Sequence, residues 1–417
     1  MDVKYGLNQA FTLDMTLIPD FGQVVTDNRI LNLSPFDVQF NENRPFFTEG
    51  TELFGKGNLF YSRRIGLEPS FSKYNPHSGN DDLVEYPGQA KIINATKISG
   101  RTQKGLGIGV LNAVTQKQFA TFYNPSTKEQ YQEENMPLTN YNILVLNQSL
   151  KNNSSISLVN SNVLRSGADR DANVTSALFD FNDKKNMWNV GGNISISNLY
   201  GVENKPVTGY AHSLYFAKTS GRFNFQLWQD MFNAKYDKSD MGFFTNNNTM
   251  DQGLWMGYNW TKPRGWYNQI RMNINTWYSR LVTPIDLYKG KQNMYQGTGV
   301  NYNFNAQTKK LWWFGVNING GLKYVDFYES RIFGRIFRNT GRIGMNAFME
   351  SNSAKKLSWG ANIFTGVGGV TKRTSLDLGL FGKIRFNSKF SVDHNIQVSN
   401  TNNQPVGHLT DIQAVGH

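Results

Sequence analysis

The sequence predicts an all-β protein, folded over residues 1–417 as one large antiparallel transmembrane β-barrel. Three observations support this prediction: long segments in which apolar and polar residues alternate, short turns that alternate with long connections along the chain, and aromatic residues near the ends of the alternating segments. We expect about sixteen to eighteen strands in this chain, as part of an incomplete barrel.

Alternation with a period of two dominates the chain and is typical of strands with one apolar and one polar face. For example, Val300, Tyr302 and Phe304 alternate with Asn301, Asn303 and Asn305. Similar runs occupy residues 11–17, 188–196, 376–386 and 390–398. Several runs approach or exceed about ten residues, the length that a tilted strand needs to cross a bilayer, whereas globular strands average about five or six. A soluble β-sandwich or propeller also alternates, but its strands are shorter.

Short turns and long connections follow each other in order along the chain. Short turns are predicted at 8–10, 101–104, 151–153, 183–186, 219–221, 261–265, 307–310, 351–356 and 387–389. Longer excursions are predicted at 119–137, 165–172, 201–207, 231–250, 282–293, 326–341 and 368–373. Outer-membrane barrels have this asymmetry because their periplasmic turns are short and their extracellular loops are long.

Tryptophans cluster near the ends of predicted strands, as at Trp255, Trp260 and Trp266. An aromatic girdle at the two membrane interfaces would place them there. Ordinary packing within hairpins would do the same.

The composition fits a barrel better than it fits other classes. Hydrophobic residues make up 39% of the chain and the mean hydropathy is −0.49, because only every second side chain of a barrel strand faces lipid. No apolar run reaches the length of a membrane-spanning helix. The net charge of +12 is spread along the chain, often at turns, so we expect no nucleic-acid partner and prefer a cationic lumen or contact with anionic lipid A. The absence of cysteine excludes disulfides and thiolate metal sites.

Strand direction singles out residues 18–88. If the short turns lie on one side of the membrane, this whole stretch is one excursion on the other side, and it is too long for an idle loop. It mixes aromatic and charged residues, which indicates a packed element. We expect it to fold inward as a plug or constriction of the lumen.

The ends of the chain suggest a fragment. Residues 2–7 are expected to be the last part of a strand, the last clear strand covers 390–400, and residues 401–417 are expected to form an irregular tail. No signal peptide is recognisable at Met1.

The most conspicuous charged group lies inside the expected plug. It consists of Glu42, Arg44, Glu49, Glu52, Arg63 and Arg64, with Phe46 and Phe47 as packing aromatics. Paired carboxylates could perform acid–base chemistry, but ion pairs that hold the excursion against the barrel wall are the favoured interpretation. We take these eight residues as plug or lumen candidates.

No catalytic, cofactor or metal site is predicted. The five histidines are not spaced as metal ligands, and the glycine-rich Gly105–Gly109 opens a strand rather than a helix. No nucleophile motif is recognisable.

Several short stretches carry a family resemblance. They include Asp2-Val-Lys-Tyr-Gly-Leu7, Pro19-Asp-Phe-Gly-Gln-Val24, Glu42-Asn-Arg-Pro-Phe-Phe47 and Leu59-Phe-Tyr-Ser-Arg-Arg-Ile-Gly66. With them the chain closely resembles the family called domain of unknown function 5916. The resemblance is dense over residues 2–66 and implies an outer-membrane barrel. Such proteins often have an N-terminal carbohydrate-binding module similar to family 9, which is absent from this sequence.

The expected role is passage or capture of a solute at the outer membrane of a Gram-negative bacterium. A glycan is one ligand class, which the resemblance alone implies. The alternative is a non-conducting scaffold or accessory subunit in surface assembly or secretion. A barrel enzyme and a soluble glycan binder are weaker alternatives.

Overall fold

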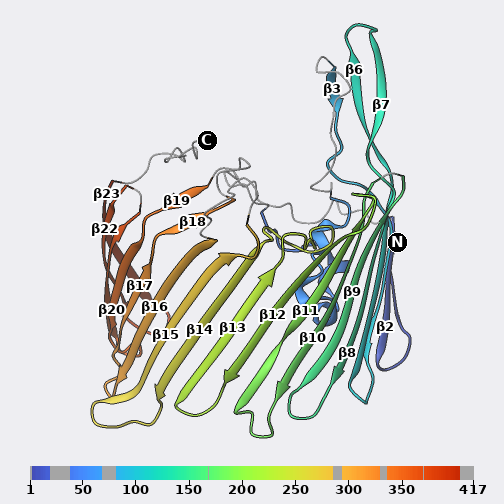
Figure 1. The fold of residues 1–417 in the computed structure, drawn as a ribbon. Coiled ribbons are helices and arrows are strands. Elements are labelled where there is room, and N and C mark those ends of the chain that lie inside the picture. The colour runs from blue at the N-terminus through green and yellow to red at the C-terminus, as the bar shows by residue number, and fades with distance from the viewer. Residues whose placement is uncertain are drawn as a thin grey trace. The chain divides into compact units, whose positions relative to one another are not determined.

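The computed structural model describes residues 2–18, 38–67, 81–167, 169–284, 294–328, 336–369 and 371–403. Within these ranges, eighteen strands belong to one large antiparallel sheet (Figure 1). The predicted all-β class and strand number are therefore confirmed. No helix in the described ranges is long and apolar enough to cross a membrane.

The chain divides into two compact units. The first comprises Met1–Phe181, Gly191–Ser213 and Phe232–Asn248, and the second comprises Asn182–Val190, Leu214–Met231 and Thr249–His417. Four strands contribute residues to both units: β10 (Asp171–Asn182), which places only Asn182 in the second unit, and β11 (Trp188–Tyr200), β12 (Val207–Lys218) and β13 (Phe223–Phe232).

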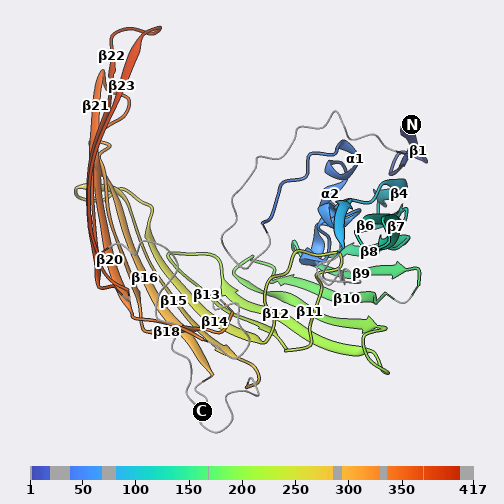
Figure 2. The same ribbon diagram turned by 90° about the horizontal axis from the view of Figure 1, so that it is seen from above.

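The first unit contains seven antiparallel strands, each paired with the next. They are β1 (Asp2–Gly6), β2 (Phe11–Leu17), β4 (Ile92–Arg101), β5 (Leu106–Thr115), β8 (Thr139–Ser149), β9 (Ser155–Arg165) and β10 (Asp171–Asn182). Between β2 and β4 lie the helices α1 (Pro45–Thr48), α2 (Thr51–Phe54), η1 (Lys56–Asn58) and η2 (Ser62–Arg64). In Figure 2, α1 and α2 lie against these strands.

The core of the first unit lies between these helices and one face of the strands. Phe47, Phe54 and Leu59 are at most 5% exposed and cluster with strand residues that include Leu111 and Ile143. Because side chains alternate along a strand, the neighbouring residues point to the opposite face. There Val110, Leu144 and Leu158 remain 39–43% exposed.

A three-stranded sheet, which was not predicted, pairs two strands of the expected excursion 119–137 with one strand of the expected excursion 18–88. It consists of β3 (Asp82–Glu85), β6 (Gln118–Asn124) and β7 (Glu129–Met136), and it projects beyond the end of the larger sheet (Figure 1). Phe122 is buried in this sheet and stacks on Tyr131. The remaining side chains of the hairpin are largely polar, so it gave no apolar face to detect.

The second unit contains eight antiparallel strands, again each paired with the next. They are β14 (Thr249–Trp260), β15 (Tyr267–Leu281), β16 (Tyr295–Thr308), β17 (Trp313–Gly321), β20 (Arg342–Glu350), β21 (Leu357–Gly368), β22 (Arg373–Arg385) and β23 (Ser391–Asn402). A small hairpin of β18 (Tyr324–Asp326) and β19 (Phe337–Asn339) contacts β16.

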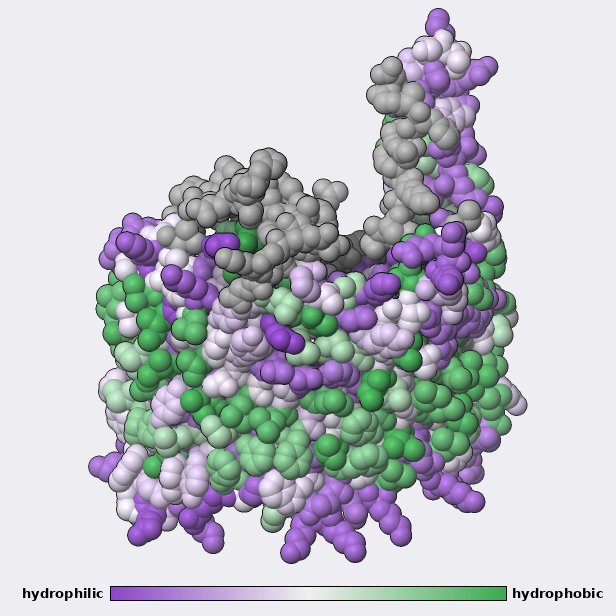
Figure 3. Space-filling view, in the orientation of Figure 1, coloured by the Kyte–Doolittle hydropathy of each residue, from purple (hydrophilic) through white to green (hydrophobic). Residues whose placement is uncertain are grey.

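The strands and turns agree with the sequence prediction. Strands β8 to β16 have 10–15 residues each. Each predicted short turn lies between two strands of the large sheet. Figure 3 shows apolar side chains gathered over the middle of the strands and hydrophilic ones along the turns at their lower ends.

Some predictions fall partly outside the described ranges. Of the expected plug 18–88, residues 19–37 and 68–80 are not described, and the same holds for 404–417 of the expected tail. At the start of that tail, β23 continues to Asn402, so the strand is slightly longer than predicted.

Candidate functional site

Two features of the described chain are candidates for function. The first is residues 38–67, called here the helical segment, which packs on the strands of the first unit. The second is a group of asparagines on one face of the second unit.

Local sequence explains why the helical segment turns so tightly. Pro45 opens α1, a position that needs no backbone N–H donor. Gly50 separates α1 from α2 with a left-handed backbone (φ 67°), which glycine adopts without strain. Helix α2 then approaches β5 at Gly107, where an added Cβ atom would lie 2.9 Å from Leu53 Cδ2.

Three of the predicted site residues form one cluster within the segment. Arg44 donates two hydrogen bonds to the carboxylate of Glu42, at 2.9 and 2.8 Å, and a third to the carbonyl oxygen of Ser62 at 2.7 Å. The hydroxyl of Ser62 donates to the same carboxylate at 2.5 Å. Arg63 Nε lies 3.8 Å from Glu42 Oε1 and donates to the carbonyl oxygen of Asn41 at 3.0 Å. Arg64 is buried near this cluster, at 8% exposure.

The cluster keeps Glu42 ionised. Burial raises the pKa of the Glu42 carboxyl, but the hydrogen bonds and charge of Arg44, together with the Ser62 hydroxyl, outweigh burial and hold the pKa below its usual range. Glu42 is therefore an acceptor that fixes the segment's fold.

Lys97 of β4 attaches the segment to the sheet. Its side chain is 1% exposed, and Nζ donates to the carbonyl oxygens of Phe46 and Glu49, the latter at 2.9 Å. Nζ also lies 4.7 Å from the centre of the Phe46 ring and 3.7 Å from a carboxylate oxygen of Asp14 on β2. Phe46 in turn packs edge-on against Phe47, with ring centres 4.9 Å apart. The sequence analysis did not single out Lys97.

The remaining predicted carboxylates, Glu49 and Glu52, connect the segment to the strands β1 and β4. Glu49 accepts a hydrogen bond from Lys4 of β1 at 2.5 Å, and Glu52 accepts one from Arg101 of β4 at 2.9 Å. The hydrogen bond and charge of Lys4 hold the pKa of Glu49 below its usual range. Glu42, Glu49 and Glu52 thus have different cationic partners, and no two of them form the carboxylate pair that acid–base catalysis would use.

A second element packs against the helical segment within the first unit. This element is the connection 233–248. Lys238 Nζ donates a hydrogen bond to the carbonyl oxygen of Asn58 at 3.1 Å. The backbone N–H of Tyr61 donates to the carbonyl oxygen of Met241 at 2.7 Å. Its Tyr236 is 2% exposed, and burial raises the pKa of this phenol to about 12. Burial also lowers the pKa of Lys238.

Ion pairs that the sequence analysis missed hold this connection in place. Asp240 is 3% exposed and lies 2.8 Å from Arg165 Nη2 and 2.7 Å from Arg170 Nη2. Arg170 also reaches Asp237 at 3.2 Å. These partners are about seventy residues apart in sequence, so no local pattern could reveal them.

In the second unit, six asparagines form what we call the asparagine ladder: Asn273, Asn275, Asn301, Asn303, Asn317 and Asn319. They occupy two adjacent rows across β15, β16 and β17. Their amides hydrogen-bond one another, for example from Asn275 to Asn301 at 3.0 Å and from Asn301 to Asn319 at 2.6 Å. Each amide can make about four hydrogen bonds, so the ladder keeps capacity for water or a solute.

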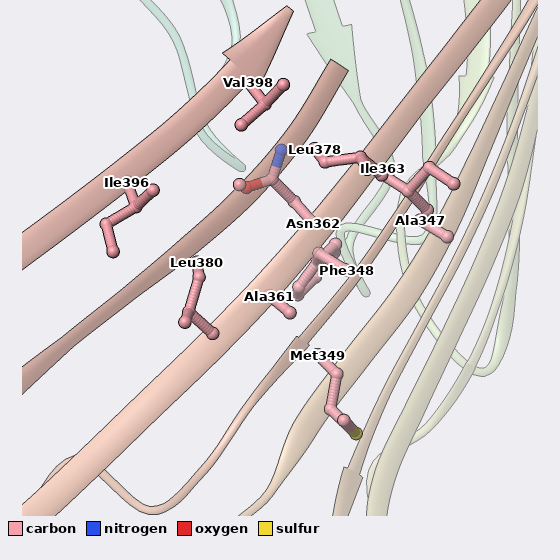
Figure 4. A pocket seen from close by; sticks show the side chains of 11 residues that line it. Ala347, Phe348, Met349, Ala361, Asn362, Ile363, Leu378, Leu380, Ile396 and Val398 are labelled. Atoms are coloured by element: carbon pink, nitrogen blue, oxygen red, sulfur yellow. The ribbon is translucent and has the colours of Figure 1, made fainter. Parts of the chain in front are cut away.

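The opposite face of the same strands is apolar. One row of paired residues crosses seven strands and contains only apolar side chains: Met272, Phe304, Val316, Ala347, Ile363, Leu378 and Val398. Ala347, Ile363, Leu378 and Val398 also line a shallow pocket of about 530 Å³, which Figure 4 shows. This pocket offers an apolar surface and no charged group.

The described residues contain no group of three or more His, Asp or Glu side chains placed to hold a metal ion.

Comparisons with known proteins identify a family. The family model described as "Domain of unknown function (DUF5916)" matches residues 1–414, nearly the whole chain, and the protein belongs to this family. No curated protein matches. Among solved structures, the chain is similar to OccK9 (OpdG) of Pseudomonas aeruginosa, with a TM-score of 0.39 and 10% sequence identity over 78% of this chain and 91% of that chain.

Proposed function

We propose that this member of the DUF5916 family is an outer-membrane β-barrel of a Gram-negative bacterium that passes or captures a small polar solute. The observation that carries the proposal is the contrast between the two faces of the second unit. A row of seven apolar residues crosses one face of this unit, and the asparagine ladder lies on the opposite face of three of the same strands, β15, β16 and β17.

This contrast fits a sheet with lipid on one side and water on the other. An unsatisfied amide in hydrocarbon costs several kcal/mol, so asparagines belong on a wet face. The apolar row includes Ile363, Leu378 and Val398, each more than a third exposed, and lipid is the solvent in which such exposure is stable. In this proposal the asparagine ladder lines the lumen.

The first unit fits the same arrangement. Its helical segment covers one strand face, and the other face exposes Val110, Leu144 and Leu158. Asn112 on the exposed face donates to Asn140 and Asn142 at 2.6 and 2.8 Å, which lowers the cost of placing these amides near lipid. The segment would then lie inside the barrel as a plug or constriction, and the eight predicted residues would line or hold it.

The net charge of +12 suits an anionic surrounding such as lipid A, as well as a cationic lumen. No nucleic-acid partner is proposed.

A single-channel experiment tests the proposal. The complete gene product would be purified from outer membranes in detergent and reconstituted in planar bilayers. We expect a heat-modifiable band on gels, as barrels give, and discrete conductance steps. Failure to partition into the outer membrane would overturn the location, and a silent but membrane-inserted barrel would overturn the passage of solutes.

The tight packing of the helical segment favours one second candidate, a non-conducting scaffold or accessory subunit. Phe47, Phe54 and Leu59 are almost fully buried, which is typical of a fixed element rather than a gate. A silent barrel that co-purifies with surface components would support this alternative.

A further inference from the structure

One tryptophan of the second unit lies flat on the sheet beside the asparagine ladder. Trp277 of β15 is paired with Gly299 of β16, and its indole extends over that neighbouring strand. The Nε1 edge of the ring lies over Gly299, and Cη2 and Cζ3 lie 2.9 Å from the place where a Cβ atom of Gly297 would be. An alanine at either position would push the ring away, so the two glycines allow it to lie down.

The upper face of this indole stays open. Trp277 is 45% exposed, although the glycine backbone covers one side of the ring. Tyr324 of β18 adds a second aromatic side chain at the edge of the site, because its Cβ lies 3.3 Å from the Cβ position of Gly297. The result is a flat, exposed aromatic platform held on rigid strands.

Amide groups stand directly next to the platform. Asn275 precedes Trp277 by two residues on the same face of β15. Its amide donates a hydrogen bond to Asn301, the residue opposite it on β16. These amides offer both donors and acceptors to a ligand.

We propose that Trp277, Tyr324 and the adjoining asparagines form a binding subsite for a neutral, hydroxyl-rich ring, as in an uncharged oligosaccharide. A pyranose has a C–H-covered face that stacks on an indole and hydroxyls around its edge that both donate and accept hydrogen bonds. Asp251, which is paired with Ser279 at the next position along this face, disfavours an acidic sugar. The proposal rests on the proposed function in so far as this face is open to water.

A cation is the other ligand that an aromatic platform could take. The ladder favours the sugar, because its amides carry no charge to pair with a cation, whereas hydroxyls can use both the donor and the acceptor end of each amide.

Binding measured in detergent tests the proposal independently of conductance. Isothermal titration of the complete, purified protein with maltohexaose should give binding in the micromolar to millimolar range, and Trp277→Ala should weaken it about tenfold, the scale of one lost aromatic stack. Trp277→Phe should retain much of the affinity. Trp359→Ala is the matched control. Trp359 of β21 is 38% exposed, lies on the face of the sheet opposite to Trp277 and packs edge-on against Trp312. Its substitution should change the affinity less than twofold.

The other outcomes are equally decisive. No binding of maltohexaose by a wild-type protein that is folded by its heat-modifiability would overturn the subsite, as would equal effects of Trp277→Ala and Trp359→Ala. Binding of tetramethylammonium in place of maltohexaose would assign the platform to a cation instead. A protein that conducts ions but does not bind maltohexaose would support the proposed function and overturn only the subsite. A protein that binds maltohexaose but does not conduct would support the subsite and overturn the passage of solutes.

Discussion

Lys97→Met is the substitution expected to release the helical segment from the first unit. Lys97 Nζ donates hydrogen bonds to the carbonyl oxygens of Phe46 and Glu49 and lies 3.7 Å from a carboxylate oxygen of Asp14. A hydrogen bond to a charged group contributes roughly 1.5–3 kcal/mol, and breaking a buried pair costs roughly 3–5 kcal/mol. Because Asp14 keeps 13% of its side chain exposed, water would recover part of this loss. We therefore expect a net destabilisation of about 3 kcal/mol, which corresponds to an opening equilibrium about a hundredfold larger.

Amide hydrogen exchange of the purified protein in lipid nanodiscs measures this opening. Peptides covering residues 45–64 should lose protection by about a hundredfold in Lys97→Met, whereas the strands β14–β17 of the second unit should keep theirs. Lys184→Met removes a lysine from an exposed turn and is the matched control. Protection of residues 45–64 within threefold of the wild type would refute the view that Lys97 attaches the segment.

The Glu42 cluster, the two faces of the second unit and the exposed ion pairs can each be tested by substitution. Because Arg44 and Ser62 hold the pKa of Glu42 below its usual range, the ionised carboxylate stabilises the segment at neutral pH, and this contribution is lost as the pH falls through the lowered pKa. Exchange of residues 45–64, corrected for intrinsic rates, should therefore rise in acid, and Glu42→Gln should abolish this acid step. Ile363→Arg should destabilise the protein by about 2–4 kcal/mol in urea unfolding from lipid vesicles, because it places a charge on the lipid-facing side. Asn303→Arg should reduce the unfolding free energy by less than about 1 kcal/mol and shift ion selectivity toward anions. Equal losses of stability in the two variants would contradict the assignment of the two faces. Lys4→Met and Glu52→Gln each break an exposed ion pair and should leave the urea midpoint of unfolding unchanged, because solvent screens such pairs. A clear drop in the midpoint would mean that these pairs are more shielded than their exposure indicates.

The strands of the large sheet could be predicted because each one carries its own signal. Residues 300–306 alternate strictly between apolar residues and asparagines, and they lie within β16 with its two faces as expected. The short turns between strands contain residues such as Asn152, Asn153 and Asn186, which adopt the left-handed backbone that such turns need.

The helical segment of the first unit could be predicted only as a packed element. Helices α1 and α2 have four residues each, too few for a helical period to appear in the sequence. The eight candidate residues were found from their density of charge and aromatic rings, and most of them make the ion pairs or packing contacts described above. Lys97 was missed because its importance depends on residues 46–49, about fifty positions away.

Charged and uncharged polar side chains have different roles in the two units of this molecule. Charged side chains that form ion pairs in the first unit, such as Glu42, Lys97 and Asp240, hold the helical segment and the connection 233–248 in place. The ladder of the second unit is uncharged and mutually hydrogen-bonded. If solutes pass over the ladder, their discrimination should depend on hydroxyl geometry and ring shape more than on charge, and substitutions there should alter solute affinity without loosening the helical segment. Substitutions at Lys97 or Asp240 should do the opposite, because they act on packing. The two sets of variants therefore test recognition and occlusion separately.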